Sequence, residues 1–477
     1  MTITTETTGH DDELVLHLER REAALVKVRT LLVEHLKVAL PPERIDLDAP
    51  LFGTGLGLDS VDAVELVVAL ETKLGVRLPE GAAGSWAFRT VHSLVELVLD
   101  PPTEAVSKPT VSAPLPELSA PVAALRTRAA LHLASPDGTL HAVAVRGEEA
   151  KEALQWLLPS RLHLRDAQAR QSLLLDERGA PLADVLVAAD DEDYLLLVDG
   201  LARDALLSHL RENLRGARAT VEDLAERFAL LSVHGPWAWE LLNEAVSPDL
   251  VALPYLNFFR IDDLIVLRAG RTGEFGYHLL VPHARAAEVQ ARITEVGLEL
   301  GLGTVSDQDL RSAALEGWFF EPQQVPKDAS PIELGLGWRL APDRDFLGRA
   351  ALEAREHPRR QVCLLSDSPF FVGDPVTIGE QTLGVVTSAI RSEARERFVA
   401  AALVDARYAH GGIDRFLVGG VPVVSVAPPL LDNRSLHVDA RRHTFRALDE
   451  VIFGPLYRQP RATMAGSRTA PAPGETP

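Results

Sequence analysis

The chain has 477 residues, of which 46% are hydrophobic and 24% charged, a balance typical of a globular protein with two to four domains. A net charge of −20 argues against a nucleic-acid partner, and a single cysteine excludes an internal disulfide framework or a multi-cysteine metal site. No apolar run approaches the ~20 residues of a bilayer span, and the N-terminus is polar and acidic, unlike a signal peptide. We therefore expect a cytoplasmic protein with no membrane partner.

The first part of the chain has the pattern of a small helical domain. Residues 1–12 are polar and expected to be disordered. Apolar positions recur at helical spacing over residues 13–38, a second helix is predicted to start at Ser60, and a third covers residues 90–99. These elements predict an all-α domain over residues 13–100.

A change of composition separates this domain from the remainder. Residues 101–121 are rich in Pro, Ser, Thr and Ala and predict a flexible linker. Residues 122–355 alternate short β-type runs with helical runs at irregular spacing, which favours an α+β fold. Strands dominate residues 356–455, as expected of a small β-barrel or sandwich, and residues 456–477 are expected to be disordered.

The glycine-rich segment GTGLGLDS ends at Ser60. Its glycine spacing differs from GxGxxG and it lacks the lysine of a P-loop, which argues against a phosphate-binding loop. A nucleophile elbow needs glycine two residues before and two after the serine, where this chain has Leu58 and Asp62. Ser60 is expected at the N-cap position, preceded by Asp59. From these residues alone, Ser60 is either a helix cap or the attachment point of a prosthetic group.

The stretch LFGTGLGLDSVDAVELVVALETKLGVRLPE resembles the signature of acyl carrier proteins. The resemblance covers the chain from about residue 20 to residue 100 and implies a four-helix carrier bundle. It also implies that a phosphopantetheinyl transferase attaches 4′-phosphopantetheine to Ser60 through a phosphodiester. The spacing of Asp59, Asp62, Glu65 and Glu71 by itself predicts an outward acidic stripe, which either faces basic partner enzymes or is only a solvated face.

Several later stretches resemble, in the same order, the glycine-cleavage T-protein (aminomethyltransferase) family. They include QSLLLDERGAPLADVLVAADDEDYLLLVDG (171–200), GRTGEFGYHLLVP (270–282) and PIELGLGWRLAPDRDFLGRAAL (331–352). The resemblance implies an α+β core with a C-terminal β-barrel, arranged around a funnel that holds a tetrahydrofolate derivative. Together with the helical part, the expected protein is multidomain.

This chain departs from the family pattern at the positions that would contact folate. The family's paired aspartate is Ala183-Asp184 here, and its pteridine-binding glutamate falls on His278. Asp184 is the candidate proton-handling carboxylate and His278 a candidate acid–base. The candidate cofactor-binding residues of the neighbouring segment are Arg271, Glu274 and Tyr277. An alternative stays open, in which Asp184 and Glu274 only hold turns. No metal site is expected.

The two resemblances together imply an enzyme of natural-product or acyl assembly. It would transfer a folate-borne one-carbon unit to or from an acyl or aminoacyl group on the phosphopantetheine arm. Its expected partners are the phosphopantetheinyl transferase, an acyl- or aminoacyl-loading enzyme and downstream assembly enzymes. Two alternatives remain: folate-independent rearrangement or cyclisation of the carried group in a repurposed pocket, and a carrier that docks partners without catalysis.

Overall fold

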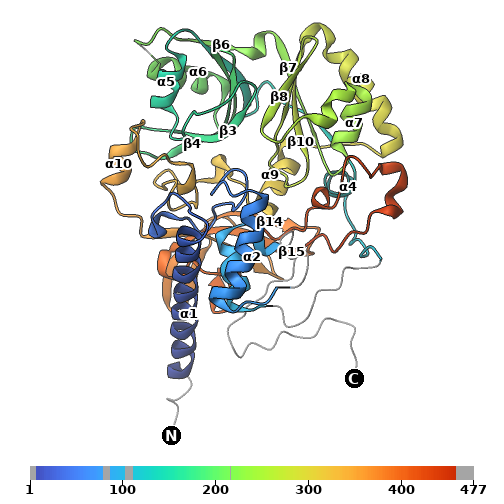
Figure 1. Cartoon of the computed structure of the whole chain (residues 1–477). Coiled ribbons are helices and arrows are strands. Elements are labelled where there is room, and N and C mark those ends of the chain that lie inside the picture. Colours follow the sequence, from blue (N-terminus) through green and yellow to red (C-terminus); the bar gives the residue numbers. More distant parts are fainter. Residues whose placement is uncertain (1–6, 79–85, 102–110, 215, 458–477) are drawn as a thin grey trace.

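The computed structural model describes residues 7–78, 86–101, 111–214 and 216–457. A helical N-terminal domain and a C-terminal β-barrel lie below two facing sheets in Figure 1. This arrangement confirms the expected fold class, a helical domain followed by an α+β fold with a C-terminal barrel. The predicted disordered tail lies almost entirely outside the described residues. Within them, no helix combines the length and the apolar character that crossing a membrane requires.

Helices dominate the described part of the N-terminal domain. Its elements are α1 (Thr7–Glu34), α2 (Ser60–Leu74) and α3 (Val91–Leu99), with 3-10 turns at Pro42–Arg44 and Trp86–Phe88. Apolar residues of the three helices form a common core, to which Leu32, Leu66 and Leu94 contribute fully buried side chains. Helix α3 is buried on almost all sides. The helical pattern of the sequence therefore becomes a compact helical domain.

Helix α1 also contacts the barrel. Leu14 and Leu18 pack into the hydrophobic core of the barrel. Further along α1, the buried Arg21 lies 3.7 Å from the buried Glu96 of α3, within the helical domain. The helix begins at Thr7, so residues 7–12 are helical where the sequence predicts disorder, and it ends four residues earlier than expected. Contact with the barrel stabilises this end of α1 and joins the helical domain firmly to the rest of the chain.

Asp59, and not Ser60, is the N-cap of α2. Its carboxylate accepts hydrogen bonds from the backbone N–H groups of Val61 and Asp62, at 2.7 and 3.1 Å. Asp62 in turn accepts one from the backbone N–H of Asp59 at 2.8 Å, which completes a capping box. The predicted cap position is wrong by one residue. Ser60 is the first helical residue, with an exposed side chain that takes no part in the cap.

Two sheets form the middle of the molecule. The five-stranded sheet is antiparallel and has the order β3 (Ala169–Leu175), β4 (Pro181–Asp190), β5 (Asp193–Asp199), β2 (Leu140–Arg146) and β6 (Thr220–Asp223). The six-stranded sheet has the order β11 (Gly303–Thr304), β1 (Ala130–Leu133), β7 (Phe228–His234), β10 (Gly276–Pro282), β9 (Leu264–Arg268) and β8 (Asn257–Ile261). Only the β1–β11 pair among these described strands is parallel.

Helices cover the outer face of each sheet, so the layers run helix, sheet, sheet, helix (Figure 1). The remaining helices are α4 (Ala120–Thr127), α5 (Ala150–Leu157), α6 (Arg203–Asn213), α7 (Ala238–Ala245), α8 (His283–Leu300), α9 (Asp307–Glu316) and α10 (Arg349–Glu353). Leu154 of α5 and Leu206 of α6 pack on the five-stranded sheet, and Ile293 of α8 packs on the six-stranded sheet. The two inner faces meet through a separate cluster that includes Leu197 and Leu267.

Six antiparallel strands close the C-terminal barrel. In order around the barrel they are β12 (Arg359–Ser366), β15 (Arg397–Asp405), β14 (Gln381–Ser392), β13 (Pro375–Ile378), β16 (Phe416–Val418) and β17 (Val421–Val426). Cys363 is buried in β12, as its apolar surroundings predict. The chain after the barrel does not add strands to it. Val438, Val451 and Phe453 instead pack into the hydrophobic core of the six-stranded sheet.

The described part of the predicted linker is held against this C-terminal segment. The backbone N–H of Ala113 donates to the carbonyl of Phe453 at 2.8 Å, and the hydroxyl of Ser112 donates to the carbonyl of Val451 at 3.3 Å. Leu118 packs against a further small hydrophobic cluster. Between Ser112 and Leu118 the chain is extended and held against the C-terminal segment, which differs from the flexible linker that the composition predicts.

Candidate functional site

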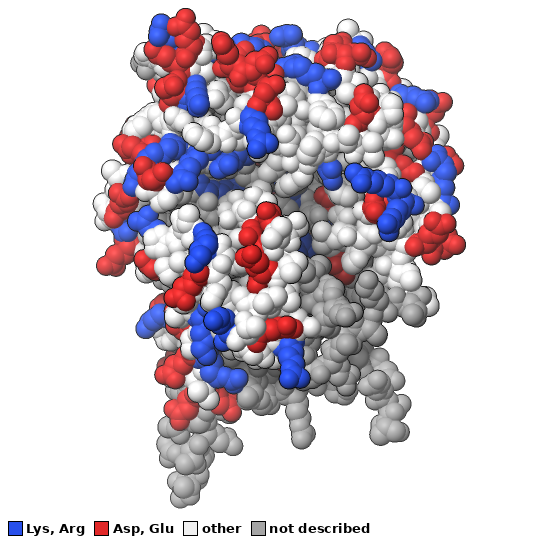
Figure 2. Space-filling model, in the orientation of Figure 1, with Lys and Arg blue, Asp and Glu red and all other residues white. Residues whose placement is uncertain are grey.

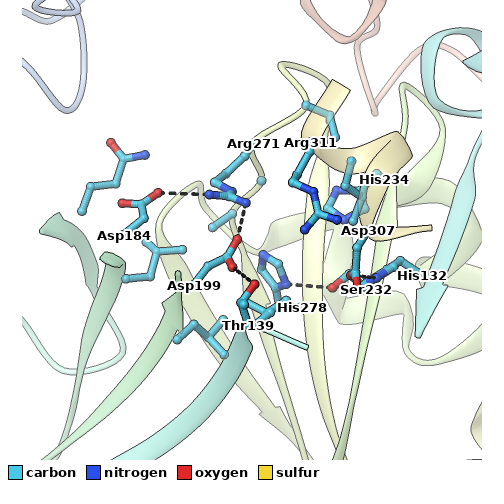
Figure 3. Close-up of a pocket in the computed structure, with 18 residues that line it drawn as sticks. His132, Thr139, Asp184, Asp199, Ser232, His234, Arg271, His278, Asp307 and Arg311 are labelled. Carbon is cyan, nitrogen blue, oxygen red and sulfur yellow. Dashed lines mark hydrogen bonds and ion pairs between the residues drawn. The ribbon is translucent and has the colours of Figure 1, made fainter. Parts of the chain in front are cut away.

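Imidazole and hydroxyl groups line the inner face of three neighbouring strands of the six-stranded sheet. They are His132 on β1, Ser232 and His234 on β7, and His278 on β10. His132 and His278 are both register partners of Ser232, so these three side chains form one row across the sheet. Side chains alternate along a strand, so Tyr277, which precedes His278 on β10, faces the hydrophobic core on the other side of the sheet. The polar row lines a pocket between the two sheets (Figure 3).

Two carboxylates face this row from the five-stranded sheet (Figure 3). Asp184 on β4 and Asp199 at the end of β5 are direct register partners, so their side chains leave the sheet next to each other. Leu186 and Leu197, two residues away on the same strands, continue this wall as an apolar surface. The pocket thus has one wall that combines carboxylates with leucines and one wall rich in imidazoles.

Arginines compensate the charge of the two carboxylates. Arg271, in the turn between β9 and β10, forms an ion pair with Asp199 and lies 3.7 Å from Asp184 and 3.3 Å from Glu321. Arg339 donates a hydrogen bond of 2.6 Å to the other oxygen of Asp184. A charged guanidinium therefore stands between acids from three separate segments.

Burial shifts the protonation equilibria of this cluster. The pKa of His278 falls to about 4, first because of desolvation and then because of the nearby charge of Arg271. Desolvation also lowers the pKa of His234 well below its usual value. The pKa of Glu321 rises to about 7, again chiefly through burial, although Arg271 opposes the rise. At neutral pH His278 and His234 are therefore uncharged, whereas Glu321, which lies 3.3 Å from Arg271, is close to its pKa.

The imidazoles differ in their hydrogen bonding. A hydrogen bond of 2.9 Å joins Ser232 Oγ to His278 Nδ1, and one of 2.8 Å joins His132 Nε2 to Asp307. Neither ring nitrogen of His234 has a partner among the described residues, although the side chain is buried. Buried polar atoms are normally satisfied, so His234 presents hydrogen-bonding capacity that a ligand in the pocket could use.

Three of the residues predicted from the sequence meet at this pocket. Asp184, Arg271 and His278 all line it, from β4, the β9–β10 turn and β10. Tyr277 does not, because it points to the opposite face of β10 and is 1% exposed in the hydrophobic core. The prediction that Tyr277 binds the cofactor is therefore corrected, because alternation along β10 turns its side chain away from the pocket.

Glu274 is also absent from the pocket lining. Its two carboxylate oxygens accept hydrogen bonds from the backbone N–H groups of Arg434 and Ser435, at 3.1 and 2.8 Å. Burial raises its pKa, although these bonds and the charge of Arg126 oppose the rise. Glu274 therefore holds the C-terminal segment in place, and its prediction as a cofactor ligand is corrected in favour of the structural alternative.

Sequence reasoning missed most of the pocket. Asp199, His132, Ser232 and His234 were not candidates, nor was Arg339. A signal was present in ALHL, LLSVH and GYHLL, where polar residues alternate with buried apolar ones on strands. Alternation places a residue on one face of its strand, but only the strand order brings the three histidines together.

Comparisons with known proteins agree with both resemblances. Residues 118–344 match the GCVT N-terminal domain, and residues 26–98 match the phosphopantetheine attachment site family. The aminomethyltransferase of Bacillus cereus (strain 03BB102) is 30% identical over 303 residues, which cover 60% of this chain and 81% of that protein. The aminomethyltransferase of Rubrobacter xylanophilus is 32% identical over 294 residues, with coverage of 59% and 77%. The crystal structure of glycine cleavage system aminomethyltransferase T from Bartonella henselae superposes with a TM-score of 0.59 at 25% identity, covering 67% of this chain and 90% of that one.

Proposed function

The chain belongs to the aminomethyltransferase family and carries a phosphopantetheine attachment domain, and on this premise we propose that it is a carrier-tethered one-carbon transferase. In this proposal, Ser60 carries 4′-phosphopantetheine, and the arm presents an acyl or aminoacyl thioester to the pocket between the sheets. A tetrahydrofolate derivative delivers or accepts the carbon unit. The setting is natural-product or acyl assembly.

The observation that carries the proposal is the attachment of the carrier domain to the body that contains the pocket. Asp46 of the helical domain accepts a hydrogen bond from the backbone N–H of Gly337 at 3.1 Å, and Arg360 of the barrel lies 3.4 Å from the same carboxylate. The hydroxyl of Thr90 donates to the carbonyl of Pro428 at 3.4 Å. A group on Ser60 is therefore presented in cis, at an effective concentration of about millimolar.

The residues of the pocket fit a tetrahydrofolate derivative. The edge of a pterin offers N–H donors, which pair best with carboxylates. The family resemblance places a glutamate where this chain has His278, but Asp199 supplies a second carboxylate beside Asp184. The free ring nitrogens of His234 offer further partners, and Leu186 provides an apolar wall for a flat ring. When bound, the folate would supply the one-carbon unit and its leaving group.

The protein's own groups then have distinct roles. Asp184 and Asp199 stabilise positive charge that develops on a substrate amine, and Arg271 keeps both carboxylates oriented in the absence of that charge. His278 is neutral at pH 7 and hydrogen-bonded to Ser232, so its imidazole can orient a polar group and relay a proton. Leu186 and Leu197 give one wall an apolar surface that limits the access of water to the reacting group.

Calorimetric titration of tetrahydrofolate and 5,10-methylenetetrahydrofolate into the full chain tests the folate part of the proposal. We expect binding at micromolar affinity or better, weakened about tenfold or more by Asp184→Asn. The matched control is Asp263→Asn, because Asp263 pairs with Arg285 at the surface and neither residue lines the pocket. Absence of binding to the folded chain would reject folate-dependent transfer.

A second candidate function is folate-independent rearrangement or cyclisation of the carried group. The hydrogen-bonded pair of Ser232 and His278 on the pocket face favours it, because such a pair can move a proton without a cofactor. Turnover of a loaded arm in the absence of folate, lost in His278→Asn, would identify this reaction. A loaded arm that is stable with and without folate would leave the third alternative, a carrier that only docks partners.

We also propose that partner enzymes dock on α2. Val61 and Val64 are 64% and 62% exposed on one side of the helix, beside the half-buried Asp62 and the exposed Glu65. An apolar stripe with an acidic border suits basic partners such as the phosphopantetheinyl transferase and the enzymes that load the arm or act on its product.

A further inference from the structure

A second cavity lies between the helical domain and the two-sheet body. The helical domain contributes residues 38–40, 43–46 and 53–56, and the two-sheet body contributes the start of β3 and residues 337–342. Eight arginines but only three carboxylates line this cavity, although the whole chain has a net charge of −20. Figure 2 shows basic side chains gathered in a hollow between the upper and lower parts of the molecule. Five of these arginines form ion pairs with carboxylates, whereas among the described residues Arg29, Arg44 and Arg170 form none. Three arginines without a carboxylate partner in one cavity of an acidic protein indicate a site for an anion.

The arginines of this cavity include two pairs of like charges. Burial, followed by the charge of Arg360, lowers the pKa of Arg29, and burial followed by the charge of Arg161 lowers that of Arg170. Arg29 donates only to the carbonyl of Ile45, at 2.9 and 2.7 Å, which does not neutralise its charge. Among the described residues, Arg170 has no hydrogen-bond or ion-pair partner for its half-buried side chain. An anion between such guanidinium groups would relieve their repulsion.

The inner end of the cavity reaches the pocket described above. Gln171 lines both cavities. Arg339 lines the basic cavity and donates its 2.6 Å hydrogen bond to Asp184, which lines the pocket. The two spaces therefore adjoin at Gln171 and at this arginine–aspartate pair.

The outer end of the cavity lies close to the attachment serine. Residues 53–56 line the cavity, and Leu56 precedes Ser60 by only four residues. An extended chain of four residues spans at most ~14 Å. A phosphate on Ser60 thus begins within this distance of Leu56 in the lining of the basic cavity, which elsewhere includes Arg339, the partner of Asp184.

We propose that the basic cavity is the entry channel for the phosphopantetheine arm of the same chain. Arginines that include Arg170 hold the anionic phosphodiester, since the planar guanidinium matches phosphate in a bidentate manner. The thioester end passes Gln171 and enters the pocket next to Asp184. This inference rests on the proposed attachment of the arm to Ser60, and it adds the route and the groups that recognise the arm.

Alkylation of the arm thiol tests the channel without requiring catalysis. Cys363 is the only cysteine of the chain and is buried in the barrel, so the thiol of the arm is the accessible one. In the full holo chain, we expect maleimide to react about tenfold faster with Arg170→Gln than with the unchanged chain, because the arm leaves the channel more often. Arg170→Lys should restore part of the protection, and Arg292→Gln, on the exposed face of α8, should leave the rate unchanged.

The results of these experiments distinguish an error in the channel from an error in the proposed reaction or in the attachment to Ser60. Equal alkylation rates in the unchanged chain and Arg170→Gln overturn the channel. If the rates are equal but Arg170→Gln weakens tetrahydrofolate binding to the apo chain, the cavity holds the anion of a free ligand instead. Protection by Arg170 in a chain that shows no one-carbon turnover supports the channel and rejects the proposed reaction. A chain whose Ser60 is not modified rejects both.

Discussion

Asp184 and Asp199 lie directly opposite each other on β4 and β5, and the guanidinium of Arg271 contacts both carboxylates. Like charges at directly opposed positions destabilise a sheet, so this pair depends on its counter-ions. The sequence retains one carboxylate of the family's adjacent aspartate pair, and the sheet supplies the second from a neighbouring strand. A pair formed across strands points both carboxylates into the pocket, whereas two adjacent residues of one strand point to opposite faces.

Arg271→Met should destabilise the protein strongly. The substitution leaves the carboxylates of Asp184, Asp199 and Glu321 without their shared cation in a largely buried place. Breaking a buried pair by removing one partner costs about 3–5 kcal/mol, and we expect a decrease of that size in the free energy of unfolding by urea at pH 7.

The control for this prediction is Arg285→Met. Arg285 pairs with Asp263 at the surface, where an ion pair contributes at most about 1 kcal/mol. Similar losses for Arg271→Met and Arg285→Met would contradict the assigned role of Arg271.

The stability of the protein should fall as the pH decreases from about 6.5 to 4. His278 has a folded-state pKa of about 4, against an ordinary value of 6.5, so in this range the unfolded chain binds a proton that the folded chain does not. The shift corresponds to about 3 kcal/mol. Urea unfolding at pH 7 and pH 4 should show a smaller loss of stability for His278→Asn than for the unchanged chain.

His437 provides a control of opposite sign. Its hydrogen bond to Asp432 raises its pKa, so its contribution is present below pH 6.5 and is lost as the pH rises through its folded-state pKa. In His437→Asn, the acid-induced loss of stability should therefore be larger than in the unchanged chain. The same direction of change for both variants would refute the assignment for His278.

Glu274→Gln should affect stability and not ligand binding. The substitution replaces one acceptor oxygen by an amide group that faces a backbone N–H, at a buried site that holds Arg434 and Ser435. We expect a loss of roughly 1–3 kcal/mol in the free energy of unfolding. Calorimetric affinity for tetrahydrofolate should stay within about twofold of the unchanged chain. A tenfold weaker affinity with unchanged stability would return Glu274 to the list of ligand-binding residues.

Ser60→Ala should abolish the mass increase that a phosphopantetheinyl transferase and coenzyme A produce, without a measurable change in stability. The hydroxyl is exposed and the cap of α2 is formed by Asp59. Asp59→Ala should instead lower the free energy of unfolding by about 1 kcal/mol, because the N-cap is lost.

Ser208→Ala is the matched control, since Ser208 is also an exposed serine on a helix. Mass spectrometry should detect the full increase for this variant. An increase that persists in Ser60→Ala would mean that a different residue carries the prosthetic group.

Features that depend on neighbours in the chain could be predicted from the sequence. Ser60 follows from a contiguous motif, and the change from helical to strand periodicity places the barrel after the α+β core. Local patterns were less informative about boundaries. The start of α1 at Thr7 accompanies contacts of Leu14 and Leu18 with a barrel that lies more than 300 residues further along the chain.

The pocket itself was decided by tertiary structure. The sequence identified Asp184, Arg271 and His278 through a family pattern, but it did not indicate which face of each strand lines the pocket. The strand order brings His132 and Ser232 beside His278, and the opposed sheet brings Asp199 to Arg271. Such contacts join residues that are far apart in the chain, so their energies depend on the folded arrangement and leave no local periodicity to detect.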